Sequence, residues 1–115
     1  MEMAEKLANL GNAYGAQGKP DEQKELLGRA LKIYEKVDNN HPEVAITLTN
    51  LSNAYAAQAN PDKQRELLER ALQIWETFYG SAEKLNTSKN PNVAITLGSL
   101  GTAYGALGDQ AKKRD

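Results

Sequence analysis

The sequence contains no cysteine among its 115 residues. This absence excludes disulfide bonds, thiolate metal ligands and cysteine nucleophiles together. No apolar run approaches the roughly 18 residues of a membrane span, and the first ten residues are too polar for a signal peptide. We therefore expect a soluble, cytoplasmic protein that does not bind membranes.

An excess of charge of one sign is also missing, because 14 Lys and Arg balance 15 Asp and Glu and leave a net charge of −1. Such a balance gives no electrostatic reason to expect a nucleic-acid partner. With 40% apolar and 25% charged residues, the composition is that of an ordinary folded protein. The length predicts a single domain over residues 1–115.

Three short patterns recur along the chain in a fixed order. The first pattern is NAYGAQG at 12–18, NAYAAQA at 53–59 and TAYGALG at 102–108. The second is QKELLGRALKIYE at 23–35 and QRELLERALQIWE at 64–76. The third is HPEVAITL at 41–48 and NPNVAITL at 90–97. The first two copies lie 41 residues apart (Tyr14 to Tyr55), and the next two 49 apart (Tyr55 to Tyr104). Eight extra residues, around 80–89, therefore lie between the second and third copies. The patterns indicate an internal repeat.

Each copy has the apolar spacing of a pair of helices. Val44, Leu48, Leu51 and Tyr55 stand at i, i+4, i+7 and i+11, which is one stripe of an α-helix. Prolines near the expected starts agree with this interpretation. The predicted helices are 2–17, 20–37, 43–58, 61–79 and 91–107, followed by a helical stub after Asp109. These helices form repeats at about 2–38, 43–79 and 91–115, the last of them truncated.

A small residue occupies the same place in each first helix. Gly11, Ser52 and Gly101 each follow a core leucine by one residue and precede a core tyrosine by three. A side chain without bulk at this place predicts a close approach of the second helix.

These features resemble the tetratricopeptide repeat, in the longer-period form found in kinesin light chains. The matching residues of the second copy are Leu48, Leu51, Ser52, Tyr55, Leu68 and Ala71. The resemblance implies an all-α fold, a right-handed superhelical α-solenoid of antiparallel helix hairpins with about two and a half repeats in five helices. It also implies a protein-interaction module whose first helices line a concave groove for an extended peptide or partner protein.

The residues of these first helices suggest how a ligand would be held. Residues 7–18, 44–58 and 92–108 contain no charged side chain. Carried over from the resemblance, the polar groove positions are Asn9, Asn12, Asn50, Asn53, Ser99 and Thr102. An asparagine amide both donates and accepts hydrogen bonds, so it can pair with a peptide main chain. We expect binding with weak salt dependence. The alternative is that these asparagines are ordinary solvated residues of a helix face.

Nothing in the sequence indicates catalysis, a cofactor or a metal. The single histidine, His41, precedes Pro42 at a predicted helix start, and no cysteine is present to complete a metal site. No serine lies in a motif with a histidine, and the chain lacks a phosphate-binding glycine motif. We expect that the protein is not an enzyme.

A structural or oligomerising segment of a larger protein remains the competing interpretation. A last helix without its partner would expose Leu97, Leu100 and Tyr104 to water. Such a stripe would either be covered in a longer array or pair with a second copy to form a homo-oligomer.

Overall fold

The computed structural model describes residues 2–80 and 90–114, and the side chains of 2–80 and 90–108. Within these residues the chain forms α-helices and no strand, which confirms the predicted all-α repeat fold. The helices are α1 (Glu2–Ala16), α2 (Pro20–Val37), α3 (Pro42–Ala57), α4 (Pro61–Tyr79) and α5 (Pro91–Arg114). The predicted insertion at 80–89 lies, apart from Gly80, outside the described residues.

The end of α5 corrects one prediction. The sequence predicted a helix ending at residue 107 and a separate stub after Asp109, but α5 continues to Arg114 without a break. A glycine inside a helix costs about 1 kcal/mol relative to alanine. The helix nevertheless continues through Gly108, because this cost is small and no proline follows in the sequence to end the helix.

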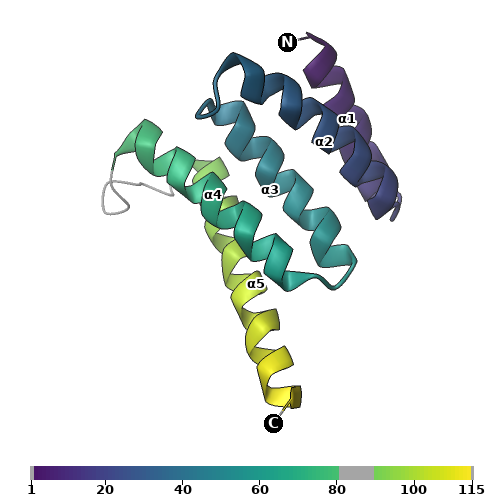
Figure 1. Cartoon of the computed structure of the whole chain (residues 1–115), viewed down its shortest axis with the longest axis vertical. Helices are drawn as coiled ribbons and strands as arrows, with labels where there is room; N and C mark the ends of the chain where they lie inside the picture. The colour runs from purple at the N-terminus through teal and green to yellow at the C-terminus, as the bar shows by residue number, and fades with distance from the viewer. Residues whose placement is uncertain (1, 81–89, 115) are drawn as a thin grey trace.

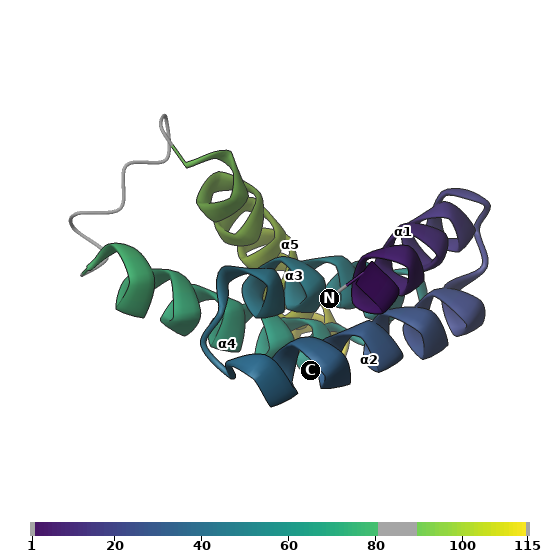
Figure 2. The ribbon, with the colours of Figure 1, turned by 90° about the horizontal axis from the view of Figure 1, so that it is seen from above.

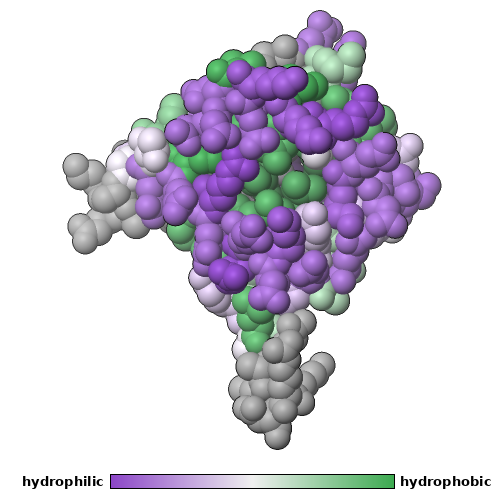
Figure 3. Space-filling view, in the orientation of Figure 1, coloured by the Kyte–Doolittle hydropathy of each residue, from purple (hydrophilic) through white to green (hydrophobic). Residues whose placement is uncertain are grey.

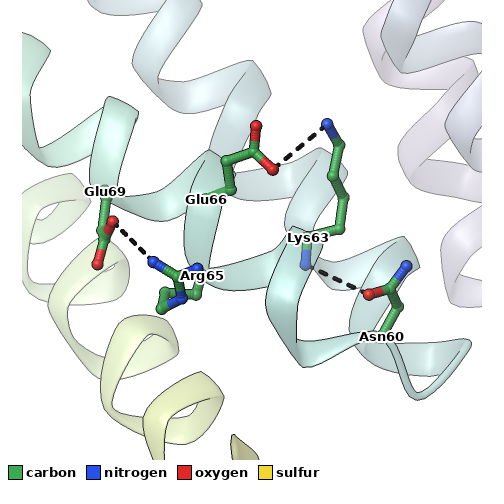
Figure 4. A network of polar contacts seen from close by, with 5 residues as sticks. All are labelled: Asn60, Lys63, Arg65, Glu66 and Glu69. Atoms are coloured by element: carbon green, nitrogen blue, oxygen red, sulfur yellow. Dashed lines mark hydrogen bonds and ion pairs between the residues drawn. The ribbon is translucent and has the colours of Figure 1, made fainter.

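The helix starts follow from local chemistry. Four helices begin with proline, whose missing N–H and fixed φ suit the first helical position. Before α3, the Nδ1 atom of His41 accepts a hydrogen bond from the Glu43 N–H at 3.0 Å. Before α4, the Asn60 side chain accepts one from the Lys63 N–H at 3.3 Å (Figure 4). His41 therefore caps a helix, as its position beside Pro42 predicted.

The helices form two curved layers. α1 packs against α2, α2 against α3, α3 against α4 and α4 against α5, and α3 also contacts α1 and α5. Viewed from above, α1, α3 and α5 lie in one layer and α2 and α4 in the other (Figure 2). The first helix of each repeat thus faces the inner side of the curve, and we call this side the inner face.

The outer layer carries most of the charged side chains of the described residues. The α2–α4 side, which faces the viewer in Figure 1, is largely hydrophilic in Figure 3. Arg70 of α4 bonds Glu35 of α2 at 2.6 Å, and Arg65 pairs with Glu69 along α4 (Figure 4). The outer layer is therefore a solvated surface.

The core explains the small residue in the first repeat but not in the third. A Cβ atom added at Gly11 would lie 3.0 Å from Cγ of Leu27, and Ser52 is fully buried. The Gly11 contact confirms the predicted close packing in the first hairpin, and the full burial of Ser52 agrees with it in the second. At Gly101 an added Cβ would meet nothing within 4 Å, so the prediction for this position is wrong. No hairpin partner covers that side of α5 within the described residues.

The exposure of α5 corrects a further expectation. Leu97 and Tyr104 are 38% and 51% exposed, but Leu100 is only 9% exposed and packs with Leu68 and Ala103. Leu100 packs against α4, the preceding helix, and the Tyr104 hydroxyl donates a hydrogen bond to the Glu69 carboxylate of that helix, whereas Leu97 and the ring of Tyr104 keep exposed surface. The three residues therefore do not form one exposed stripe.

Candidate functional site

Two neighbouring hollows lie on the inner face. The first hollow, of about 270 Å³, lies between α1 and α3 above α2, and Glu5, Asn9, Asn12, Tyr34, Glu43 and Asn50 are among its lining residues. The second hollow, of about 40 Å³, lies between α3 and α5 above α4. Ile46 and Asn50 line both hollows, so the two follow one another along the inner face.

The two hollows occupy equivalent places in successive repeats. With the repeat offsets of 41 and 49 residues, Tyr34 corresponds to Trp75, Asn9 to Asn50 and Thr47 to Thr96. All six of these residues line the hollow expected from this correspondence. Differences between the hollows therefore show which features are specific to one repeat.

Hydrogen bonds join several of the side chains that line the second hollow. The indole N–H of Trp75 donates to Oγ1 of Thr96 at 3.3 Å, and the hydroxyl oxygens of Thr49 and Thr96 lie 2.9 Å apart. Thr49 lines the second hollow at the position that Ala8 occupies in the first, so the second hollow has one more polar side chain at this place. The second hollow has room for about one water molecule, and the hydroxyl and indole groups that line it already have partners.

The first hollow is lined by a largely buried tyrosine whose hydroxyl has no partner among the described residues. Tyr34 is only 2% exposed, yet its hydroxyl makes no hydrogen bond to any residue that the structure describes. Every described side-chain polar atom that is fully closed off from solvent does have a partner. The Tyr34 hydroxyl must therefore reach the open space of the hollow.

Charge inside the hollow affects this hydroxyl. Burial raises the pKa of Tyr34, and the negative charges of Glu43 and Glu5 raise it further. A tyrosine hydroxyl is protonated at neutral pH even at its ordinary pKa of about 10, so this hydroxyl offers both a donor and an acceptor to the hollow.

The predicted groove residues divide into two sets. Asn9, Asn12 and Asn50 line the first hollow, and Asn50 also reaches the second. Asn53, Ser99 and Thr102 line neither hollow. Asn53 and Thr102 are exposed, and the Thr102 hydroxyl donates to the Gly98 carbonyl of its own helix at 3.2 Å.

Sequence reasoning missed the two carboxylates and the tyrosine. Glu5 precedes Asn9 by four residues and Glu43 precedes Asn50 by seven, spacings that place both on the inner side of their helices. The uncharged stretch at 44–58 begins directly after Glu43, and the stretch at 7–18 begins two residues after Glu5, so counting charge within those stretches could not find the two carboxylates. The helical spacing was the available signal.

A family model described as "Tetratricopeptide repeat" matches residues 2–77. The match covers well over half of the chain. The chain belongs to the tetratricopeptide repeat family. Its α1–α2 and α3–α4 hairpins are the repeats that the match covers, and α5 lies beyond it. Among curated proteins no match to this tetratricopeptide repeat chain is found.

Two further properties bear on the site. Over 2–80 and 90–108, no three His, Asp or Glu side chains come together as a metal site would require. None of the helices in the described part of this tetratricopeptide repeat protein has the length and apolar character needed to cross a membrane.

Proposed function

We propose that the chain binds an extended peptide along the inner face, across the first hollow. Tetratricopeptide repeats are generally protein-interaction modules, and their family is a non-catalytic scaffold. The observation that carries the proposal is the meeting of Asn9, Asn12 and Asn50 around one open hollow. The 41-residue offset exceeds the usual period of about 34 residues and supports kinship with the kinesin-light-chain form.

The three amides are chemically free to bind a main chain. None of them makes a side-chain hydrogen bond to another residue within the described part of the chain, and Asn9 and Asn12 are exposed. An extended peptide presents N–H and C=O groups along its length, and each asparagine amide can satisfy one of either kind. Recognition of this kind holds a peptide without selecting its side chains.

A displayed library of random dodecapeptides, selected against the purified chain, tests the proposal. A triple variant, N9A/N12A/N50A, should weaken the Kd of the enriched peptides about tenfold or more, because it removes several hydrogen bonds worth about 1 kcal/mol each. Gln73→Ala is the matched control, since it removes an exposed amide from the outer layer.

Two outcomes would contradict the proposal. One is a library that enriches no peptide at all. The other is a Kd that is the same for the triple variant and for the wild-type chain.

The exposed side of α5 favours self-association as a second candidate function. Leu97 and Tyr104 leave apolar surface open to water, and a second copy would cover it at a gain of about 25 cal/mol for each Å² buried. Light scattering on L97A/Y104A and on the triple asparagine variant separates the candidates. If α5 associates, only L97A/Y104A changes the mass in solution; a wild-type chain that stays monomeric at high concentration excludes this function.

A further inference from the structure

Three positions of the first hollow carry groups that the second hollow lacks. Glu5, Glu43 and Tyr34 correspond in the next repeat to Ile46, Asn92 and Trp75. The second hollow therefore has no carboxylate, and its buried ring nitrogen is hydrogen-bonded within the protein. The comparison isolates an acidic, open site in the first repeat alone.

The two carboxylates have no cation of their own. Within 2–80 and 90–108, Glu5 and Glu43 take part in no ion pair, whereas Glu35 and Glu69 are each paired with an arginine. Both lie in the first turn of a helix, where the helix dipole favours an acid. The dipole explains an acid at each helix start, but not why both line one hollow without a compensating charge.

The Tyr34 hydroxyl gives the second, independent observation. A hydroxyl that reaches open space without a partner in the protein can exchange its hydrogen bonds with water for hydrogen bonds with an entering group. Tyr34 is almost wholly buried and its hydroxyl reaches into the first hollow. At the equivalent position, by contrast, the indole N–H of Trp75 donates a hydrogen bond to the Thr96 hydroxyl. The hydroxyl is thus available to a group that enters from outside.

Every polar side chain around the hollow can accept a hydrogen bond. The carboxylates accept only, and the tyrosine hydroxyl and the asparagine amides each supply an acceptor oxygen. A lysine ammonium or an arginine guanidinium carries only donors and a positive charge. A basic side chain therefore matches both the hydrogen-bonding pattern and the charge, and the volume of about 270 Å³ leaves room for its stem.

We propose that the first hollow binds the basic side chain of a lysine or arginine in the peptide held along the inner face. This inference rests on the proposed function and adds side-chain selectivity to it. Glu5 and Glu43 provide the charge, and the Tyr34 hydroxyl accepts a hydrogen bond from the bound cation. Binding of such a residue adds a salt-dependent contribution to an otherwise main-chain interaction.

Three synthetic peptides test the inference by NMR titration of the ¹⁵N-labelled full chain. The probes are acetyl-Ala-Ala-Lys-Ala-Ala-amide, its norleucine analogue and its glutamate analogue. The lysine peptide should shift the side-chain amide signals of Asn9, Asn12 and Asn50 and bind about tenfold tighter than the norleucine peptide, the effect expected for a charged hydrogen bond. The glutamate peptide should bind least.

Paired variants locate the selectivity. E5Q/E43Q should abolish the preference for lysine, and Tyr34→Phe should reduce it while keeping the buried ring. The matched control is E22Q/D62N, which removes the same charge from the first turns of α2 and α4, away from the hollow. This control should retain the full preference.

The contrary outcomes are distinct from failure of the proposed function. Equal affinity for the lysine and norleucine peptides overturns the inference while leaving groove binding intact. A preference that survives in E5Q/E43Q places the cation elsewhere and also overturns it. If none of the three peptides shifts the asparagine signals, the inference fails, and the displayed library decides groove binding separately.

Discussion

A single hydroxyl group, that of Thr96, joins three helices. It accepts from the Trp75 indole of α4, lies 2.9 Å from the Thr49 hydroxyl of α3 and bonds the Asn92 carbonyl of its own helix α5. Thr96→Val keeps the shape but leaves the buried indole N–H without its partner. We expect a loss of about 1–3 kcal/mol in the free energy of unfolding, measured by urea denaturation.

The control for this variant lies at the same position of the previous repeat. Thr47 is also buried, but its hydroxyl donates only to the Glu43 carbonyl of its own helix. Thr47→Val should therefore cost less than about 1 kcal/mol. Equal losses in the two variants would show that the link between α3, α4 and α5 contributes nothing beyond ordinary packing.

Sequence patterns could locate the inner face at residue level but not its chemistry. Asn9 and Asn50 were found because they recur at matched places, and repetition marks what the repeats share. Glu5 and Tyr34 were missed because their counterparts, Ile46 and Trp75, differ from them. The chemistry of the first hollow depends on which side chains of α1, α2 and α3 come together in space. Only the packing of these three helices shows this arrangement.

Among the structural elements, the turns within the two hairpins adopt the same backbone shape with different residues. Gly18 between α1 and α2 has φ +72°, and its equivalent Ala59 between α3 and α4 has φ +55°. An L side chain in this left-handed region costs roughly 1–2 kcal/mol. Ala59→Gly should therefore stabilise the protein by up to about 1 kcal/mol after the backbone entropy of glycine is allowed for, and Gly18→Ala should destabilise it by about 1 kcal/mol.

The same exchange inside a helix should have the opposite sign and serves as the control. Gly28 lies within α2, and a Cβ added there would meet nothing within 4 Å. Gly28→Ala should stabilise the protein by up to about 1 kcal/mol, because alanine has the higher helix propensity. Thermal denaturation of the three variants checks the signs. A destabilising Ala59→Gly would contradict the assignment of strain to this turn.

Helix bounds were predictable to within about a residue wherever proline or a turn residue marks them. Pro20, Pro42, Pro61 and Pro91 each begin a helix. The end of α5 was not predictable in this way, because Gly108 weakens a helix without forbidding it. Whether a helix crosses such a glycine depends on small differences in free energy that a residue pattern does not contain.

At the scale of the whole molecule, the resemblance to the tetratricopeptide repeat predicted a solenoid of helix hairpins, but the sequence did not predict which neighbouring helix each apolar residue contacts. Leu97 and Leu100 belong to one apolar stripe in the sequence, yet only Leu100 is buried. In a stack of hairpins, each first helix has one side for the preceding helix and another for the following one. α5 is packed on only the first of these sides within the described residues.

This difference predicts a gradient of hydrogen exchange along the chain. α3 contacts α1, α2, α4 and α5 and has buried residues along most of its length, so its amides should exchange slowest. In α5 no described side chain beyond Ala103 is buried, and glycines occupy 105 and 108. The amides beyond Ala103 should therefore exchange fastest among the helices, as mass spectrometry or NMR can measure.

Substitution of the two glycines tests whether weak helix formation causes this rapid exchange. Each Gly→Ala change favours the helix by about 1 kcal/mol, so G105A/G108A should slow exchange there by roughly fivefold for each residue. Gly28→Ala in α2 should leave exchange in α5 unchanged. If the wild-type amides beyond Ala103 exchange as slowly as those of α3, a contact outside this hairpin stack protects them. Slowing that increases with protein concentration would then identify that contact as a second copy of the chain.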